Sequence, residues 1–196
     1  MLLVMPTRSY GADVLKVEHV KGGDPGRRNR SSDGYQWYHE AFNRGKRSLA
    51  LDLRHPDATS VFHELVEWAD VLAENFKPGF LDSVGLGYAD LKDVNPSLIY
   101  ASNSGFGKRG DWAGRGSFDV VCQGFSGIAV AQGGGVSHKP MFVENGVADQ
   151  VGGMNFAYAI VAALYAREKR GGKGQRIETS QLGACISLQA FWLTPF

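Results

Sequence analysis

Short β-branched segments alternate along this sequence with segments of helical periodicity, and this alternation most limits the possible folds. The densest helical signal covers residues 154–170, where Ala, Ile, Val and Leu are followed by cations and then by Gly171. Cations and glycine are typical of a helix C-terminus. Strands that alternate with helices of ten or more residues predict an α/β domain, with a Rossmann-like parallel sheet and helices on both faces.

The other expected elements extend this pattern over the whole chain. The expected strands are residues 14–18, 48–53, 71–73, 98–102 and 175–179. The expected helices are residues 57–69, 118–130, 154–170 and 181–193, with two short pieces after residue 79 and a glycine-rich loop over residues 132–145. No linker or internal repeat divides the chain, so we expect one domain over residues 1–196. We expect it to be truncated at both ends, with the first strand and the last part of the sheet missing.

Composition and charge exclude several classes of protein. Twenty-one Lys and Arg residues against 20 Asp and Glu residues give a formal charge of +1, so no overall field attracts nucleic acid or an anionic membrane. Cys122 and Cys185 lie far apart without a Cys-x-x-Cys motif, which argues against a disulfide framework and a metal site. The apolar stretches are too short to span a bilayer. We expect a cytoplasmic protein, and a mitochondrial or peroxisomal location stays open because the N-terminus looks truncated.

A glycine motif follows the expected strand at residues 98–102. Gly105, Gly107 and Gly110 have the G-x-G-x-x-G spacing of a dinucleotide fingerprint. A true fingerprint opens a helix whose N-terminus holds the pyrophosphate, whereas residues 111–116 continue as a loop. A plain glycine-rich loop is therefore the favoured interpretation over an NAD site.

Arg27, Arg28 and Arg30 form a basic run after the first expected strand. Guanidinium groups match the geometry of phosphate, so this run is a candidate phosphate site. A solvated loop explains the same residues equally well.

Asp149 is the most informative carboxylate in the sequence. We expect it directly before the long helix that begins near Met154, where the helix dipole stabilises a negative charge. Gly152 and Gly153 follow it and leave room for a substrate carbonyl to reach backbone donors. The alternative is a helix-capping or loop aspartate, and spacing alone does not separate the two.

Many short blocks in this order resemble the N-terminal part of family III CoA-transferases, the CaiB/BaiF family that includes formyl-CoA transferase. Examples are Gly-Ala-Asp-Val-Leu-Lys-Val-Glu at residues 11–18 and Glu-Asn-Phe-Lys-Pro-Gly at residues 74–79. The other similar blocks are residues 23–25, 43–53, 69–71, 86–88, 95–96, 104–107, 118–123, 126–127 and 171–175. The resemblance covers nearly the whole chain.

The resemblance implies a mechanism centred on Asp149. In this family an aspartate attacks an acyl-CoA thioester, forms an acyl-aspartyl anhydride and passes CoA to a second carboxylic acid. The matching aspartate is Asp149, and Gly152 and Gly153 become the candidate donors to the developing oxyanion. CoA is substrate and product, and no other cofactor is implied. The partners implied are an acyl-CoA, a small carboxylic acid and, in the full-length protein, a second copy in an interlocked homodimer.

The resemblance also points to a set of residues that contact CoA. The set comprises Leu51, Asn75, Arg115 and Asp119, with Lys46, Arg47 and Arg27 as weaker phosphate candidates. Two phosphate contacts are in doubt, because His19 and Ser83 stand where several family members carry Arg.

Two other functions remain open within this resemblance. α-Methylacyl-CoA racemases of the family carry a His beside the aspartate of the block at residues 118–123, and proton exchange at carbon needs two bases. The corresponding residue here is Phe118, which favours a transferase. The other alternative is an inactive fragment that only binds CoA.

Overall fold

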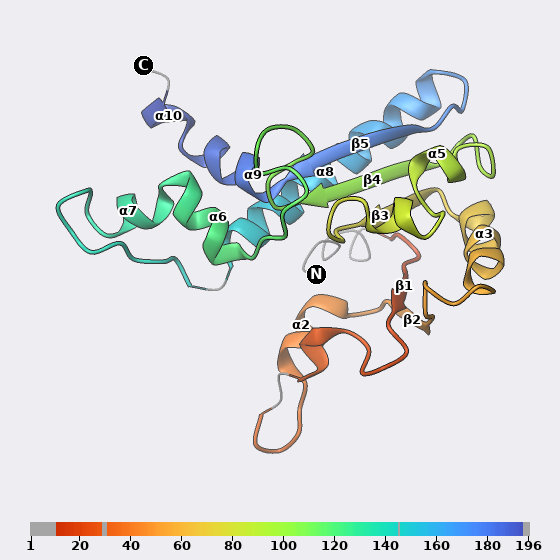
Figure 1. The fold of residues 1–196 in the computed structure, drawn as a ribbon, viewed down its shortest axis with the longest axis horizontal. Helices are drawn as coiled ribbons and strands as arrows, with labels where there is room; N and C mark the ends of the chain where they lie inside the picture. The colour runs from red at the N-terminus through yellow and green to blue at the C-terminus, as the bar shows by residue number, and fades with distance from the viewer. Residues whose placement is uncertain (1–10, 29–30, 145, 194–196) are drawn as a thin grey trace.

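The computed structural model describes residues 11–28, 31–144 and 146–193, which form five parallel-paired strands and the helices that cover them (Figure 1). The strands are β1 (Leu15–Glu18), β2 (Arg47–Ala50), β3 (Val71–Glu74), β4 (Ile99–Ser104) and β5 (Gln175–Ser180). β1 pairs with β2 in one sheet, and a second sheet has the order β3-β4-β5. The expected parallel α/β architecture is confirmed, and the described strands form two sheets rather than one.

The helices follow the expected order with three differences, one of which is that the single helix expected over residues 181–193 is divided into two. They are η1 (Pro25–Arg28, a 3-10 turn), α2 (Trp37–Asn43), α3 (Ala58–Trp68), α4 (Phe80–Ser83), α5 (Tyr88–Leu91), α6 (Asp119–Ser126), α7 (Ile128–Gln132), α8 (Val147–Lys169), α9 (Gln181–Leu188) and α10 (Ala190–Leu193). Sequence analysis missed α2. It also predicted one helix over residues 118–130, which is wrong: Gly127 has φ +83°, a left-handed conformation that ends α6 and begins α7.

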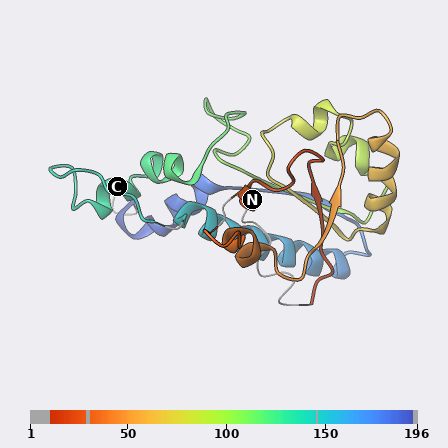
Figure 2. The ribbon, with the colours of Figure 1, turned by 90° about the horizontal axis from the view of Figure 1, so that it is seen from below.

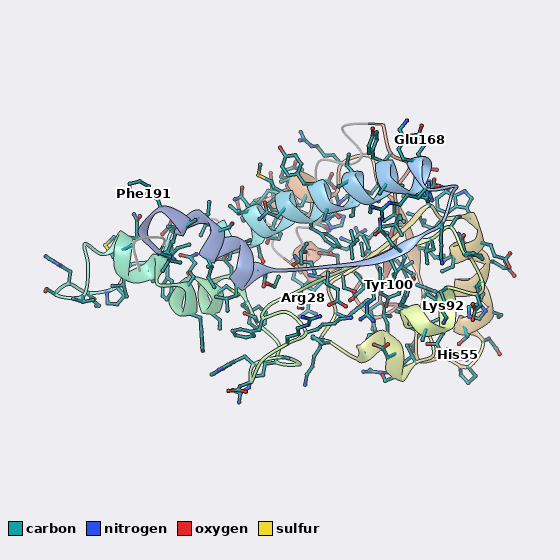
Figure 3. All side chains as sticks on the ribbon, turned by 90° about the horizontal axis from the view of Figure 1, so that it is seen from above. Arg28, His55, Lys92, Tyr100, Glu168 and Phe191 are labelled. Atoms are coloured by element: carbon teal, nitrogen blue, oxygen red, sulfur yellow. The ribbon has the colours of Figure 1, made fainter. Side chains whose placement is uncertain are left out.

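Helices cover both faces of the β3-β4-β5 sheet (Figure 2). On one face Tyr100 of β4 packs with Phe62 of α3 and Leu91 of α5. On the other face Ala101 of β4 packs with Phe156 of α8. Figure 3 shows Tyr100 inside the molecule on the side of α5. Adjacent residues of β4 therefore serve opposite layers, as the alternation of side chains along a strand requires.

The long helix α8 organises the second sheet and begins earlier than expected. It starts at Val147 rather than near Met154, and it ends where the sequence predicted, with Gly171 and Gly172 at φ +72° and +83°. The N–H of Gly172 donates to the carbonyl of Arg167 at 2.9 Å, which closes the last turn. Contrary to the expectation that every apolar stretch is too short, α8 is the one described helix long and apolar enough to cross a membrane by length and composition. It packs against β4, β5 and α9, as the core helix of an α/β layer does.

Candidate active site

Asp149 lies in the first turn of α8. Gly146, at φ +74°, is the residue before the helix, and Asp149 is the third helical residue. The expectation that Asp149 precedes the helix is therefore wrong. Asp149 nevertheless lies at the N-terminal, positive end of the helix dipole, as expected. The early start of α8 puts Asp149 on a rigid element instead of a loop.

Asp119, the first residue of α6, caps the N-terminus of α8. Its Oδ1 accepts hydrogen bonds from the backbone N–H of Ala148 at 2.6 Å and of Asp149 at 3.0 Å. Its Oδ2 accepts a hydrogen bond from Nε2 of the fully buried Gln123 at 2.5 Å. Both oxygens of Asp119 thus accept hydrogen bonds that hold the start of α8 in place, and its contact with CoA remains a prediction.

Gln123 extends this network to the loop over residues 132–145. Its Nε2 donates to the carbonyl of Val143 at 2.9 Å, and its Oε1 accepts from the N–H of Val143 at 2.8 Å. A side-chain amide that pairs with both backbone groups of one residue fixes that residue as a strand neighbour would. The loop that precedes α8 is therefore anchored to α6.

The carboxylate of Asp149 accepts a hydrogen bond from a side chain of α9. Nε2 of Gln181, the first residue of α9, donates a hydrogen bond to Oδ1 of Asp149. Burial raises the pKa of Asp149, and the negative charge of Asp119 raises it further. A partly buried carboxylate beside a second negative charge is less stabilised as an anion, so it is more reactive towards an electrophilic carbonyl.

Gly152 and Gly153 do not have the role that the sequence suggested. Both are buried residues in the interior of α8, beyond the first turn. Only the first four N–H groups of a helix lack intrahelical acceptors, and the N–H of Gln150 already donates to the carbonyl of Gly146 at 2.9 Å. Their N–H groups are therefore used by the helix and are not free for an oxyanion. Gly152 packs against Gln181, whose Cγ would lie at an ordinary van der Waals distance of 3.5 Å from an added Cβ.

The charges of Asp149 and Asp119 also act on a side chain of α2. The pKa of the half-buried Tyr38 is raised by burial first and then by the charges of Asp149, Asp24 and Asp119. Sequence analysis named neither Tyr38 nor Gln181. The block of residues 118–123 was the one signal that pointed to this region from another element.

Two of the weaker phosphate candidates have protein partners. Arg27 makes a two-pronged ion pair with Glu18, Nε to Oε2 at 2.8 Å and Nη2 to Oε1 at 2.9 Å. Hydrogen bonding by Arg27 is the largest cause that lowers the pKa of Glu18, to about 2. Arg47 pairs with Asp13 at 2.7 Å on the surface. Arg27 therefore shapes the turn after β1, and the phosphate role of both residues remains a prediction.

Lys46, Leu51 and Asn75 line one cleft between the two sheets. Nζ of Lys46 donates to the carbonyl of Phe42 at 2.7 Å. Burial, followed by the charge of Lys16, lowers the pKa of Lys46 to about 8. A lysine in such surroundings gains from an anionic partner, which fits the predicted contact with CoA.

Arg115 belongs to the loop between β4 and α6. Its guanidinium carbon lies 4.0 Å from the ring centroid of Trp112, which packs on Phe125 at 4.5 Å. The loop also contains Gly105 and Gly107, and no helix opens until Asp119. The favoured interpretation of the glycine motif as a loop is thus confirmed, and within the described residues no three His, Cys, Asp or Glu side chains gather as metal ligands.

Comparison with known sequences gives an extended match. The profile of CoA-transferase family III matches residues 9–195. The acetyl-CoA:oxalate CoA-transferase of Acetobacter aceti is 39% identical over 178 residues, covering 90% of this chain and 46% of that protein. The succinate–glutarate CoA-transferase of Agrobacterium fabrum is 41% identical over 180 residues, covering 88% of this chain and 44% of that protein.

Solved structures share the fold. A CaiB/BaiF family protein from Brucella suis has a TM-score of 0.86 at 35% identity and covers 97% of this chain and 51% of its own. A hypothetical protein from Mycobacterium tuberculosis has a TM-score of 0.88 at 31% identity and covers 97% of this chain and 53% of its own. The chain spans about half the length of these relatives. Sequence and fold agree, and this chain belongs to CoA-transferase family III.

Proposed function

We propose that this chain carries the nucleophile of an enzyme that moves CoA from an acyl-CoA thioester to a carboxylic acid. Asp149 attacks the thioester carbonyl, so that a C–O bond forms as the C–S bond breaks and CoA leaves as its thiolate. The acyl group is then held as an anhydride on Asp149. The acceptor carboxylate attacks the side-chain carbonyl of Asp149 and expels the donor as its free carboxylate, and the CoA thiolate then attacks the acceptor's acyl carbon and releases the Asp149 carboxylate. One difficult exchange becomes several easier steps.

The observation that carries this proposal is the environment of the Asp149 carboxylate. It sits at the start of α8, with Gln181 as its side-chain donor and with its pKa raised by burial and by Asp119. A carboxylate meant only to cap a helix would use its oxygens on backbone N–H groups, and here Asp119 already caps α8. Asp149 is left with its carboxylate available for chemistry.

The finer features of the family are also proposals for this chain. We propose that CoA is its substrate and product without a further cofactor, that the protein acts in the cytoplasm, and that it works as a homodimer. The named relatives that transfer CoA to oxalate or between succinate and glutarate support small dicarboxylic acids as acceptors. Phe118, 79% exposed at the start of α6, offers no titratable group for racemisation.

A transfer assay tests the proposed function. The protein is incubated with succinyl-CoA and glutarate, or with acetyl-CoA and oxalate, and the new acyl-CoA is separated by chromatography. We expect CoA transfer that falls at least a hundredfold in Asp149→Asn. Exchange of the α-proton of a 2-methylacyl-CoA without transfer would instead indicate a racemase, and CoA binding by calorimetry without turnover would indicate a binding module.

A further inference from the structure

The start of α9 is held at the end of β5, beside α8. β5 ends at Ser180, and α9 begins at the next residue (Figure 1). Oγ of Ser180 caps α9 by accepting a hydrogen bond from the N–H of Gly183 at 3.1 Å. The N–H of Leu182 donates to the carbonyl of Gly105 at 2.9 Å, in the loop after β4. Contacts on both sides therefore fix the position of Gln181, which lies between these residues.

The side chain of Gln181 reaches from α9 to α8. Its Cγ packs against Gly152, and its Nε2 donates a hydrogen bond to Oδ1 of Asp149. Its Oε1 lies 3.9 Å from Sγ of Cys122, a buried thiol of α6. An ionised carboxylate can only accept hydrogen bonds, whereas a thiol can donate one. The amide therefore presents its NH₂ group to Asp149 and its oxygen to the thiol.

This hydrogen bond distinguishes the two oxygens of Asp149. Because Oδ1 is engaged by Gln181, the proposed function places the attack on the thioester at Oδ2. In the resulting anhydride, Oδ2 is the bridging oxygen and Oδ1 is the carbonyl oxygen of the aspartyl side chain. The carbonyl oxygen of the acylated residue then lies against the amide NH₂ of Gln181.

Attack on the side-chain carbonyl of Asp149 generates an oxyanion. When the acceptor carboxylate adds to Cγ, the electron pair of the C=O bond moves onto Oδ1. The C=O bond forms again when the Cγ–Oδ2 bond breaks and the donor acid leaves with Oδ2 as its carboxylate. A preorganised donor at the oxygen that gains charge lowers this barrier. The N–H groups of Gly152 and Gly153 are used within α8, so they do not supply this donor.

We propose that Gln181 is a catalytic residue, the oxyanion donor for attack on the side-chain carbonyl of Asp149. This role rests on the proposed function. The same hydrogen bond gives no help to the first attack, because Oδ1 loses negative charge as Oδ2 bonds to the thioester carbon. Gln181 therefore acts on the second attack and not on the first. This division distinguishes an oxyanion donor from a residue that only holds Asp149 in place.

Gln181→Met tests this division, because methionine has a similar length and no N–H donor. Quenched-flow mixing of the protein with succinyl-CoA, followed by mass spectrometry of its peptides, measures acylation of Asp149. Chromatography of the product after glutarate is added measures the complete transfer. We expect acylation at close to the unsubstituted rate or faster, about a hundredfold loss of transfer, and accumulation of the acylated protein.

Two further variants separate the donor from the packing of α9. Gln181→Leu also lacks a donor, so it should give the same pattern with a side chain of different shape. Ser180→Ala removes the cap of α9 next to the donor but leaves the amide of Gln181 in place. We expect little change in acylation or in transfer in this control.

The outcomes separate the role of Gln181 from the proposed function. Unchanged transfer in Gln181→Met, equal losses of acylation and transfer, or an equal loss of transfer in Ser180→Ala would overturn the role of Gln181 and leave Asp149 as the nucleophile. No acylation of Asp149 in the unsubstituted protein would overturn the proposed function and the role of Gln181 with it.

Discussion

Asp119 and Asp149 both lie at the start of α8, but their carboxylates have different hydrogen-bond partners. Asp119 uses its carboxylate on the N–H groups of Ala148 and Asp149, and Asp149 keeps its own for Gln181. The negative charge of Asp119 adds to burial in raising the pKa of Asp149. The residue that positions the proposed nucleophile therefore also makes its anion less stable and more reactive.

Two substitutions at Asp119 separate these effects. Asp119→Ala removes the cap and should cost about 0.5–2 kcal/mol of unfolding free energy. Asp119→Asn keeps a capping oxygen and should cost less. Both variants remove a like charge, so the pKa of Asp149 should fall towards its usual range in both. Denaturant unfolding and a ¹³C NMR titration of the Asp149 carboxyl measure the two quantities, and an unchanged Asp149 pKa in both variants would contradict the coupling.

Sequence reasoning reached Asp149 through the family resemblance but not its partners. Asp119 and Gln181 lie 30 and 32 positions from Asp149, so their contacts depend on how α6 and α9 pack on α8. The spacing of apolar residues within one segment carries no information about contacts between distant segments. The donor role given to Gly152 and Gly153 failed for a related reason, because it depended on where the helix begins.

At the scale of elements, α6, α8 and α9 pack around two buried thiols. Cys122 of α6 and Cys185 of α9 are both fully buried and share a small core with Ala148 of α8. Burial raises the pKa of both thiols, that of Cys185 to about 11. Both thiols are free, as the sequence predicted from the absence of a cysteine framework.

Thiol labelling tests this packing. At pH 8 both cysteines should react with a disulfide reagent roughly a hundredfold more slowly in the native protein than in denaturant, because the reactive species is the thiolate and neither thiol is accessible. Val136→Cys provides the control, since Val136 is 94% exposed and its replacement should label rapidly. Rapid native labelling of Cys122 and Cys185 would show that α6 and α9 do not pack as described.

Element types were predictable where the periodicity is long, and boundaries were not. α3, β3, β4 and β5 lie close to their expected ranges, because apolar spacing and turn residues define them. α2 was missed because Trp37–Asn43 is short and mostly polar or aromatic, without a helical stripe of aliphatic residues. The early start of α8 was not predicted because its first turn depends on Gly146 and on the cap that Asp119 supplies. Neither residue is part of a periodic pattern of apolar residues.

At the scale of the whole molecule, the candidate site residues are divided between the two sheets and the helices that follow their strands. Lys46 and Leu51 lie with the first sheet, and Asn75, Asp119 and Asp149 with the second. The sequence predicted a parallel α/β chain but not its separation into two sheets. That separation depends on which strands pair, and composition and periodicity do not predict strand pairing. The chain spans about half the length of these relatives.

The most direct test of the central claim is to trap the acyl group on the protein. The protein is incubated with an acyl-CoA, hydroxylamine is added to convert an activated aspartyl carbonyl into a hydroxamate, and the modified residue is mapped by mass spectrometry. We predict a hydroxamate on Asp149 alone, which disappears in Asp149→Asn while the protein stays folded. A hydroxamate on Asp119 or Glu144, or CoA transfer that proceeds in Asp149→Asn, would contradict the assignment of Asp149 as the nucleophile.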